Sequence, residues 1–206
     1  MMSLSSDFET DKQRLAELLV ETKAFQYSPD EPFQLASGAT SEYYFDLKLL
    51  NGHPEGINAV AKVFYHYIKK FPDVRAVGGL ESGSISIATA VSQLSYFEHQ
   101  NDPSNPLIES FFVRKAPKKH GTQKLIEGRI SSPVVIIDDV ITSGMSAIIA
   151  VHAVQEKYEC KSLMSIIFRG SDEQREVIEN EIPLQYIFHK DQFIEEFKKQ
   201  FKELTA

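Results

Sequence analysis

The stretch that most limits how this chain can fold is Pro133–Ser146, which reads P-V-V-I-I-D-D-V-I-T-S-G-M-S. Its first part, Val134–Ile137, is apolar and β-branched throughout, which is typical of a strand buried on both faces of a sheet. The apolar run stops at Asp138 and Asp139, a short polar turn follows, and helical spacing of apolar residues begins at Met145. The stretch therefore predicts a central strand, a turn and a helix.

The turn between this strand and helix is suited to a phosphate group. The first backbone N–H groups of a helix have no acceptor within the helix, and the helix dipole favours an anion beside them. Hydroxyl groups in and after the turn supply further donors. The predicted phosphate-binding residues are Thr142, Ser143, Gly144, Met145 and Ser146. Taken alone, a Thr-Ser-Gly sequence is more typical of an ordinary helix cap.

The two adjacent carboxylates make the prediction more specific. A carboxylate beside a phosphate repels it, so the pair is costly unless another part of the ligand needs it. Ribose hydroxyls are such a part, because they donate hydrogen bonds that carboxylates accept well. Asp138 and Asp139 next to the turn therefore indicate a ribose 5-phosphate site. The alternative is a pair of solvated turn residues beside a capped helix.

Length, charge and cysteine content restrict the class of protein. A chain of 206 residues can form one sizeable α/β domain but not two. The net charge of −7 argues against a general nucleic-acid surface. Cys160 is the only cysteine, which excludes an intrachain disulfide and a thiolate zinc site and favours a reducing compartment. Without a targeting pattern or an apolar run of membrane-spanning length, we expect a cytoplasmic protein that does not bind membranes.

Strand and helix patterns alternate along most of the chain. The predicted strands are Val74–Leu80, Leu107–Val113, Val134–Ile137, Lys161–Phe168 and Pro183–Phe188. The predicted helices are Pro54–Lys70, Ser84–Tyr96, Met145–Tyr158, Ser171–Glu181 and Asp191–Leu204. This alternation predicts an α/β fold with a mainly parallel central sheet, helices on both faces and a ligand crevice at the carboxyl ends of the strands. We expect one domain, with an α/β core at about 54–190 and a C-terminal helix at 191–206.

The first 50 residues lack this alternation. A helix capped by Asp7 or Thr10 is expected first, with an apolar face formed by Leu15, Leu18, Leu19 and Phe25. Phe33–Gly38 and Glu42–Leu47 then predict a hairpin. Tyr43, Tyr44 and Phe45 cannot all face one side of a strand, so at least one of them faces away from the core and could cover a flat ligand. Core packing is the alternative for each aromatic ring.

Basic residues cluster once in the sequence, in Arg114–Lys124. This segment has no apolar period and contains a proline and a glycine, so a long loop is predicted. An ordinary solvated loop is one interpretation. The other is a catalytic role, because Arg114, Lys115, Lys118 and His120 could close over a negatively charged leaving group.

Three segments resemble known enzymes. The strand, acidic pair and V-I-T-S-G-M-S turn resemble the 5-phosphoribosyl 1-diphosphate (PRPP) motif of type I phosphoribosyltransferases. The R-K-x-x-K-x-H-G pattern from Arg114, followed by Ile126–Gly128, resembles the catalytic loop of orotate phosphoribosyltransferases in particular. Ser37–Lys48 is similar to the segment that forms a hood over the base site in that family. The resemblance covers about Phe33–Arg169.

The resemblance implies a type I phosphoribosyltransferase fold with a small N-terminal hood, and Mg²⁺-dependent transfer of ribose 5-phosphate from PRPP to orotate. In that reading Asp138 and Asp139 hold the ribose, and Thr142–Ser146 hold the 5-phosphate. The pyrophosphate would be bound by Ser82, Gly83, Arg114, Lys115, Lys118 and His120, and the orotate by Tyr44, Phe45, Thr142 and Arg169. Mg²⁺ would be held mainly by PRPP. The family also implies a homodimer whose catalytic loop reaches the partner's site.

One position departs from the family pattern. Many relatives carry a lysine where Ser82 stands, so the loop Glu81-Ser82-Gly83 would bind pyrophosphate through backbone and hydroxyl donors only. Glu81 adds a negative charge to the same loop.

Alternative functions remain open at this point. A type I phosphoribosyltransferase for a purine or uracil would have no carboxylate for Arg169 to bind. A PRPP-sensing regulator would keep the fold without catalysis, although Lys118 and His120 argue against it. A plain nucleotide-binding module is the weakest alternative, because the glycine-lysine phosphate loop is absent.

Overall fold

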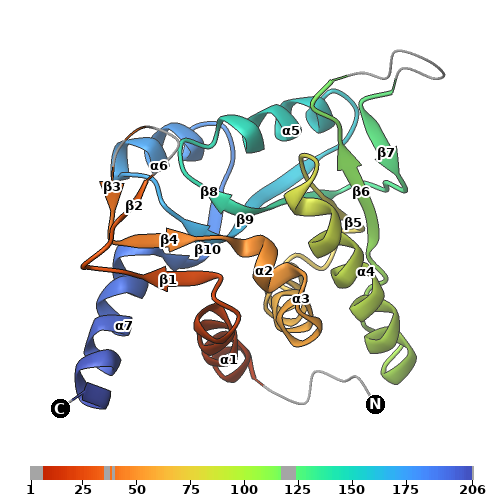
Figure 1. Ribbon diagram of the computed structural model, residues 1–206. Helices are drawn as coiled ribbons and strands as arrows, with labels where there is room; N and C mark the ends of the chain where they lie inside the picture. The colour runs from red at the N-terminus through yellow and green to blue at the C-terminus, as the bar shows by residue number, and fades with distance from the viewer. Residues whose placement is uncertain (1–6, 35–37, 39, 117–123, 206) are drawn as a thin grey trace.

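The computed structural model describes residues 7–34, 38, 40–116 and 124–205, with side chains up to residue 199. Within these residues, a six-stranded sheet has the order β10-β9-β8-β5-β6-β7 (Figure 1). Its strands are β5 (Ala76–Gly78), β6 (Glu109–Val113), β7 (Ile126–Gly128), β8 (Val134–Ile141), β9 (Cys160–Phe168) and β10 (Leu184–His189). All neighbouring strands are parallel except β6 and β7, which are antiparallel. The predicted mainly parallel sheet is confirmed.

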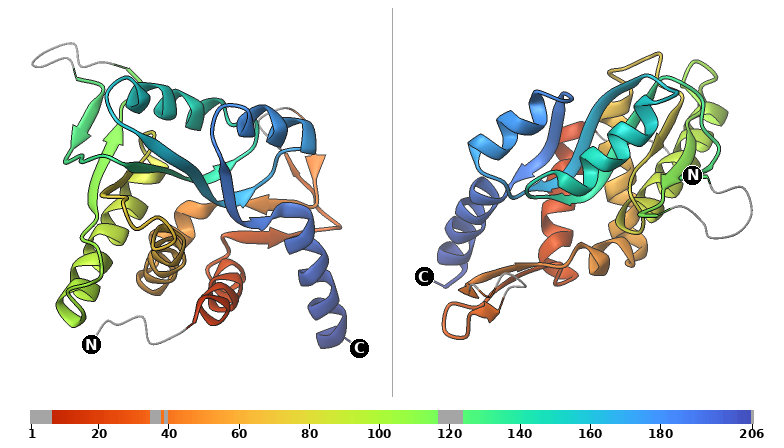
Figure 2. Two further views of the ribbon diagram at one scale, coloured as in Figure 1. Left: turned by 180° about the vertical axis from the view of Figure 1, so that it is seen from behind. Right: turned by 90° about the horizontal axis from the view of Figure 1, so that it is seen from above.

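Helices cover both faces of this sheet (Figures 1 and 2). The described helices are α1 (Phe8–Glu21), α2 (Leu47–Asn51), α3 (Pro54–Ile68), α4 (Gly83–Asn101), α5 (Met145–Gln155), α6 (Asp172–Glu179) and α7 (Lys190–Thr205). Helices α5 and α6 lie on one face, and α1, α3 and α4 lie on the other. None of the helices in the described part of the chain is long and apolar enough to cross a membrane.

The central strand β8 connects the two hydrophobic cores. Val134 and Ile136 pack into the core beneath α5 and α6, whereas Val135 and Ile137 pack into the core with α1, α3 and α4. All four side chains are fully buried. Because successive side chains of a strand point to opposite faces, an unbroken apolar run is what a strand between two helical layers requires.

The predicted end of this strand was wrong. β8 does not stop before the acidic pair but continues through it to Ile141, and its partners on β9 include Ser165 opposite Asp138 and Phe168 opposite Ile141. The long strand β9 keeps offering backbone partners beyond the point where the apolar run ends. Ladder hydrogen bonds rather than side-chain polarity therefore decide where β8 ends.

The N-terminal hairpin was predicted with the wrong partner. Tyr43–Phe45 forms β4, which pairs with β1 (Phe25–Tyr27), whereas β2 (Phe33–Gln34) pairs with β3 (Thr40–Ser41). Phe25 therefore lies on a strand and not on the face of the first helix, which ends at Glu21. Aromatic packing explains the pairing, because rings of both strands meet on one side, with Tyr27 and Tyr43 stacked at 5.0 Å.

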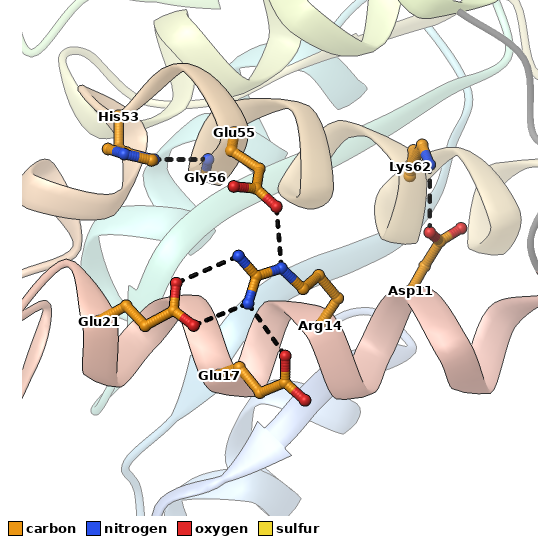
Figure 3. A network of polar contacts seen from close by, with 8 residues as sticks. All are labelled: Asp11, Arg14, Glu17, Glu21, His53, Glu55, Gly56 and Lys62. Atoms are coloured by element: carbon orange, nitrogen blue, oxygen red, sulfur yellow. Dashed lines mark hydrogen bonds and ion pairs between the residues drawn. The ribbon is translucent and has the colours of Figure 1, made fainter.

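Helix α1 is tied to α3 by charged side chains (Figure 3). Arg14 Nε donates to Glu55 Oε1 at 2.8 Å, and Lys62 Nζ donates to the buried Asp11 at 3.3 Å. Arg14 also pairs with Glu17 and Glu21 on its own helix. The pair at Asp11 is the better shielded of the two, so α1 is held against α3 by an ion pair as well as by apolar packing.

Candidate functional site

A pocket of about 170 Å³ opens where β8 ends and α5 begins. Its walls are formed by Asp138, Val140, Ile141, Thr142, Ser143, Gly144, Met145, Ser146 and Ala147. One carboxylate of the acidic pair and all five predicted phosphate-binding residues therefore share one small pocket. The pocket lies at the carboxyl end of a parallel strand, where α/β folds commonly bind ligands.

The start of α5 leaves its first N–H groups available. Gly144 is the N-cap residue with φ of 77°, and within the described chain no side chain caps this helix. A Cβ atom at Gly144 would lie 2.5 Å from Ile178 Cγ1, so both the backbone conformation and the packing require glycine. Thr142, Ser143 and Ser146 are exposed around this turn. The arrangement offers backbone donors, hydroxyl donors and a helix dipole to an anion.

The acidic pair is held by short bonds to the backbone. Asp138 Oδ1 accepts the N–H of Asp139 at 2.9 Å, and Asp139 Oδ1 accepts the N–H of Val140 at 2.8 Å. Burial, and then the neighbouring charge of Asp139, raise the pKa of Asp138 from 3.8 to about 7, while the charge of Lys115 acts in the opposite direction. Asp138 therefore changes its protonation state near neutral pH.

The turn after β5 lies against this pair. A Cβ atom at Gly83 would lie 3.0 Å from Asp139 Oδ2, so the first residue of α4 touches the carboxylate. Ser82 precedes it as an exposed N-cap residue whose own side chain makes no capping hydrogen bond. The Glu81–Ser82 peptide bond is cis. The predicted pyrophosphate residues Ser82 and Gly83 thus lie next to the predicted ribose residues.

Two of the predicted cations follow β6. Arg114 Nε donates to Glu127 Oε1 at 3.1 Å, and Arg114 Nη1 lies 3.9 Å from Glu81 Oε2. The N–H of Lys115 donates to Glu81 Oε1 at 3.0 Å. Lys118 and His120, which were also predicted to bind pyrophosphate, lie outside the described residues.

Arg169 reaches the same edge of the sheet from β9. Its backbone N–H donates to Ile141 O at 2.7 Å, and its side chain is half-buried. The next residue, Gly170, packs so closely that a Cβ atom would lie 2.5 Å from the carbonyl oxygen of Thr142. The structure therefore brings Arg169 and Thr142, both predicted to bind the base, to neighbouring positions.

The two aromatic residues predicted to bind the base point in different directions. Tyr44 is 37% exposed and stacks on Phe33 at 5.5 Å. Phe45 instead packs into the core, with its ring 5.0 Å from that of Phe25. Of the adjacent aromatics, Tyr44 is thus the one that faces away from the core, and the contacts of Phe45 are those of a packing residue.

Sequence reasoning missed what Glu81 does. It counted this residue only as an unfavourable charge in the pyrophosphate loop, whereas the structure makes it the partner of Arg114 and of the Lys115 backbone. The residue types alone were a partial signal, with Glu81 after one predicted strand and Arg114 after the next, but the order of the strands in the sheet was needed to pair them.

The site offers some, but not all, of the oxygen ligands that a hard divalent cation needs. Asp138 and Asp139 offer carboxylate oxygens of the kind that Mg²⁺ prefers. Among the described residues, no three side chains of the histidine, cysteine, aspartate or glutamate type come together as a metal site. A cation here would therefore need further oxygen ligands from a bound molecule or water.

Comparison with known proteins places these features in context. No protein-family model matches the chain. An orotate phosphoribosyltransferase of Aquifex aeolicus is 36% identical over 182 residues, covering 86% of this chain and 94% of that protein. The crystal structure of Mycobacterium tuberculosis H37Rv orotate phosphoribosyltransferase with inorganic phosphate is 27% identical with a TM-score of 0.70, and covers 89% of this chain and 98% of that one. The same enzyme with PRPP is 26% identical with a TM-score of 0.66 and the same coverage.

Proposed function

This chain belongs to the orotate phosphoribosyltransferase family, and from that premise we propose how its site transfers ribose 5-phosphate from PRPP to orotate. The products are orotidine 5-phosphate and pyrophosphate, and the reaction serves pyrimidine biosynthesis. The observation that carries the proposal is the single pocket in which Asp138 meets the uncapped start of α5. One end of this pocket suits ribose hydroxyls and the other suits a phosphate.

PRPP is oriented by two sets of groups. Asp138 and Asp139 accept hydrogen bonds from the ribose hydroxyls, and the backbone and hydroxyl donors of Thr142–Ser146 bind the 5-phosphate. Both sets belong to one strand and the turn that follows it, so the distance between them is fixed by the backbone. The sugar is therefore held at both ends before the reaction begins.

Charge separates in the reaction, and the site supplies groups for each charge. The orotate ring nitrogen donates an electron pair to C1 of the ribose and loses its N–H proton to solvent, while the bond from C1 to the pyrophosphate oxygen breaks and pyrophosphate leaves with the bonding electrons. Positive charge that develops on the sugar is favoured by the two aspartates. Negative charge on the leaving group is favoured by Arg114, Lys115 and the N–H groups at the start of α4, beside Ser82 and Gly83. Lys118 and His120 are proposed for the same role.

We propose Mg²⁺ as the cofactor, bound mainly through PRPP. When bound, the ion neutralises part of the charge of the pyrophosphate group. Asp138 and Asp139 would contribute to its coordination directly or through water, because both present hard oxygen ligands.

We propose that Arg169 binds the orotate carboxylate through two parallel hydrogen bonds, with Tyr44 and the Thr142 turn beside the ring. The position of Gly170 against Thr142 supports this arrangement, because it fixes the start of the Arg169 side chain next to the turn. Phe45 would support the base site only indirectly, from the core.

We also propose a homodimer in which the segment with Lys118 and His120 completes the partner's site, as family resemblance suggests. Mixing Lys118→Ala and Asp139→Asn variants tests this arrangement. Hybrid dimers would contain one site with both functional parts, so activity should recover to about a quarter of the wild-type value if the subunits mix at random. Confirmed subunit exchange without recovery would contradict sharing between subunits.

The activity itself is tested by incubating the protein with PRPP, Mg²⁺ and orotate and following the loss of orotate absorbance. Adenine, hypoxanthine and uracil serve as control bases, with release of pyrophosphate as the common measurement. We expect turnover with orotate alone. Equal turnover with uracil would show that the carboxylate of the base is not recognised.

A further inference from the structure

Glu81 lies at the point where the pyrophosphate loop meets the end of β6. Its N–H donates to Val113 O at 2.8 Å, and the preceding residue Leu80 forms a parallel bridge with Val113. The backbone of Glu81 is therefore fixed relative to β6. Its side chain extends towards the two residues that follow that strand, Arg114 and Lys115.

One carboxylate contacts both of these residues. Glu81 Oε1 accepts the Lys115 N–H at 3.0 Å, and Glu81 Oε2 lies 3.9 Å from Arg114 Nη1. The side chains of Glu81 and Arg114 are 29% and 27% exposed, so this contact is partly shielded from water. Glu81 thus fixes the backbone of one predicted pyrophosphate ligand and partly neutralises the other.

Arg114 has a second acidic neighbour. Its Nε donates to Glu127 Oε1 at 3.1 Å, and Glu127 lies on β7, opposite Phe112 of β6. The guanidinium therefore lies between two carboxylates. An anion that binds Arg114 has to act against both negative charges, and Glu81 is the one that belongs to the predicted pyrophosphate loop.

Residues next to Glu81 also influence the acidic pair Asp138 and Asp139. Burial raises the pKa of Asp138, and the positive charge of Lys115 acts against this rise. On the other side, Glu81 is two residues before Gly83, which touches Asp139. The carboxylate of Glu81 thus lies between the start of α4, which contacts Asp139, and the residues that follow β6.

We propose that Glu81 is a positioning residue for the pyrophosphate end of the site, and that its charge limits how tightly the pyrophosphate product is held. This inference rests on the proposed function. The hydrogen bond to Lys115 keeps the residues after β6 in place for the forward reaction. The negative charge competes with pyrophosphate for Arg114 and Lys115, and so favours release of the product.

Two substitutions separate these roles. Glu81→Gln keeps an oxygen acceptor for the Lys115 N–H but removes the charge, whereas Glu81→Ala removes both. For Glu81→Gln we expect the inhibition constant of pyrophosphate to fall by about three-fold, the size of effect typical of a partly exposed charge pair. We expect Glu81→Ala to lower kcat by about ten-fold, because Lys115 loses its anchor.

A matched control is Glu109→Gln, which removes one negative charge from β6 at the end of the strand away from the site. Glu109 pairs with Arg129 Nε at 2.7 Å, and we expect no change in pyrophosphate inhibition on its replacement. Raising the salt concentration should reduce the difference between wild type and Glu81→Gln, since the effect is electrostatic. Thermal unfolding of each variant shows whether it is folded.

Pyrophosphate binding is measured by calorimetry as well as by product inhibition of orotate turnover. An unchanged pyrophosphate affinity in folded Glu81→Gln would overturn the inference, and so would equal kcat values for Glu81→Ala and wild type. If the wild-type protein does not convert orotate, the proposed function fails, whereas the calorimetric comparison still tests the effect of Glu81 on pyrophosphate.

Discussion

Gly83 lies so close to Asp139 that a Cβ atom on the glycine would be 3.0 Å from the Oδ2 oxygen of the aspartate. The start of α4 and the end of β8 therefore meet at the carboxylate itself. This contact links the predicted pyrophosphate loop to the acidic pair without any intervening side chain. Even one methyl group added at Gly83 would therefore displace the Asp139 carboxylate.

Gly83→Ala should therefore impair catalysis more than folding. The methyl group would displace the Asp139 carboxylate by a few tenths of an ångström, and we expect kcat/KM for PRPP to fall by about ten-fold, or about 1.4 kcal/mol. Gly52→Ala is the matched control, because its Cβ atom would lie 3.1 Å from the Lys48 carbonyl oxygen in α2. Steady-state kinetics and thermal unfolding of both variants check the prediction. A similar kinetic loss in Gly52→Ala would contradict it.

The raised pKa of Asp138 predicts how PRPP use depends on pH. Ionised carboxylates accept hydroxyl hydrogen bonds more strongly than protonated ones, so kcat/KM for PRPP should rise as the pH passes through about 7. Asp139→Asn removes the neighbouring charge and should shift the midpoint to lower pH. Lys115→Ala removes an opposing charge and should shift it to higher pH. PRPP titrates identically in all three proteins, so midpoints that do not differ would exclude Asp138 as the titrating group.

The same pKa predicts a change in stability with pH. Asp138 has a pKa of about 7 in the folded protein and an ordinary value near 3.8 when unfolded, so the folded state holds its proton more tightly between these values. The contribution of this group to folding stability is present below about pH 4 and is lost as the pH rises to about 7. At pH 8 the free energy of unfolding of Asp138→Asn should therefore exceed that of wild type by about 4 kcal/mol, and the difference should disappear near pH 4. Calorimetric unfolding at both pH values measures the difference, and a constant difference would contradict the raised pKa.

We expect Arg169 to determine the specificity of the enzyme for a base that carries a carboxylate. Arg169→Gln removes the cation while leaving the Gly170 contact with Thr142, and we expect KM for orotate to rise by about thirty-fold, equivalent to about 2 kcal/mol for a charge-assisted pair. KM for PRPP should change little. Arg175→Gln is the control, since Arg175 lies on α6 and pairs with Glu179 at 3.7 Å. Equal effects on both Michaelis constants would place Arg169 outside the base site.

The core of the fold and the strand, turn and helix from Val134 onwards could be predicted from the sequence because their signals are local. The four β-branched residues Val134–Ile137 have to be buried on both faces, and the Thr-Ser-Gly turn follows directly, so strand, turn and helix can be recognised from one short stretch. The membership of β4 could not be recognised in this way. Strands of three residues carry almost no periodicity, and Tyr43 and Phe45 find their partners at Phe25 and Tyr27 through tertiary packing.

Two site features depended on tertiary structure in a similar way. The extension of β8 to Ile141 is set by the length of β9, which has no signal within β8 itself. The partnership of Glu81 with Arg114 joins the ends of two neighbouring strands, and it becomes visible only when β5 and β6 are known to be adjacent. The sequence shows that Glu81 and Arg114 are charged, but only the order of the strands in the sheet shows that they form a pair.

Because β8 runs on to Ile141, the two aspartates are held within the central strand of the sheet and not in a surface turn. Amide hydrogens along this stretch should exchange with solvent at rates close to those of global unfolding even before any substrate is present. In the proposed PRPP complex, ordering of Asp138 and Asp139 would then not reduce the affinity.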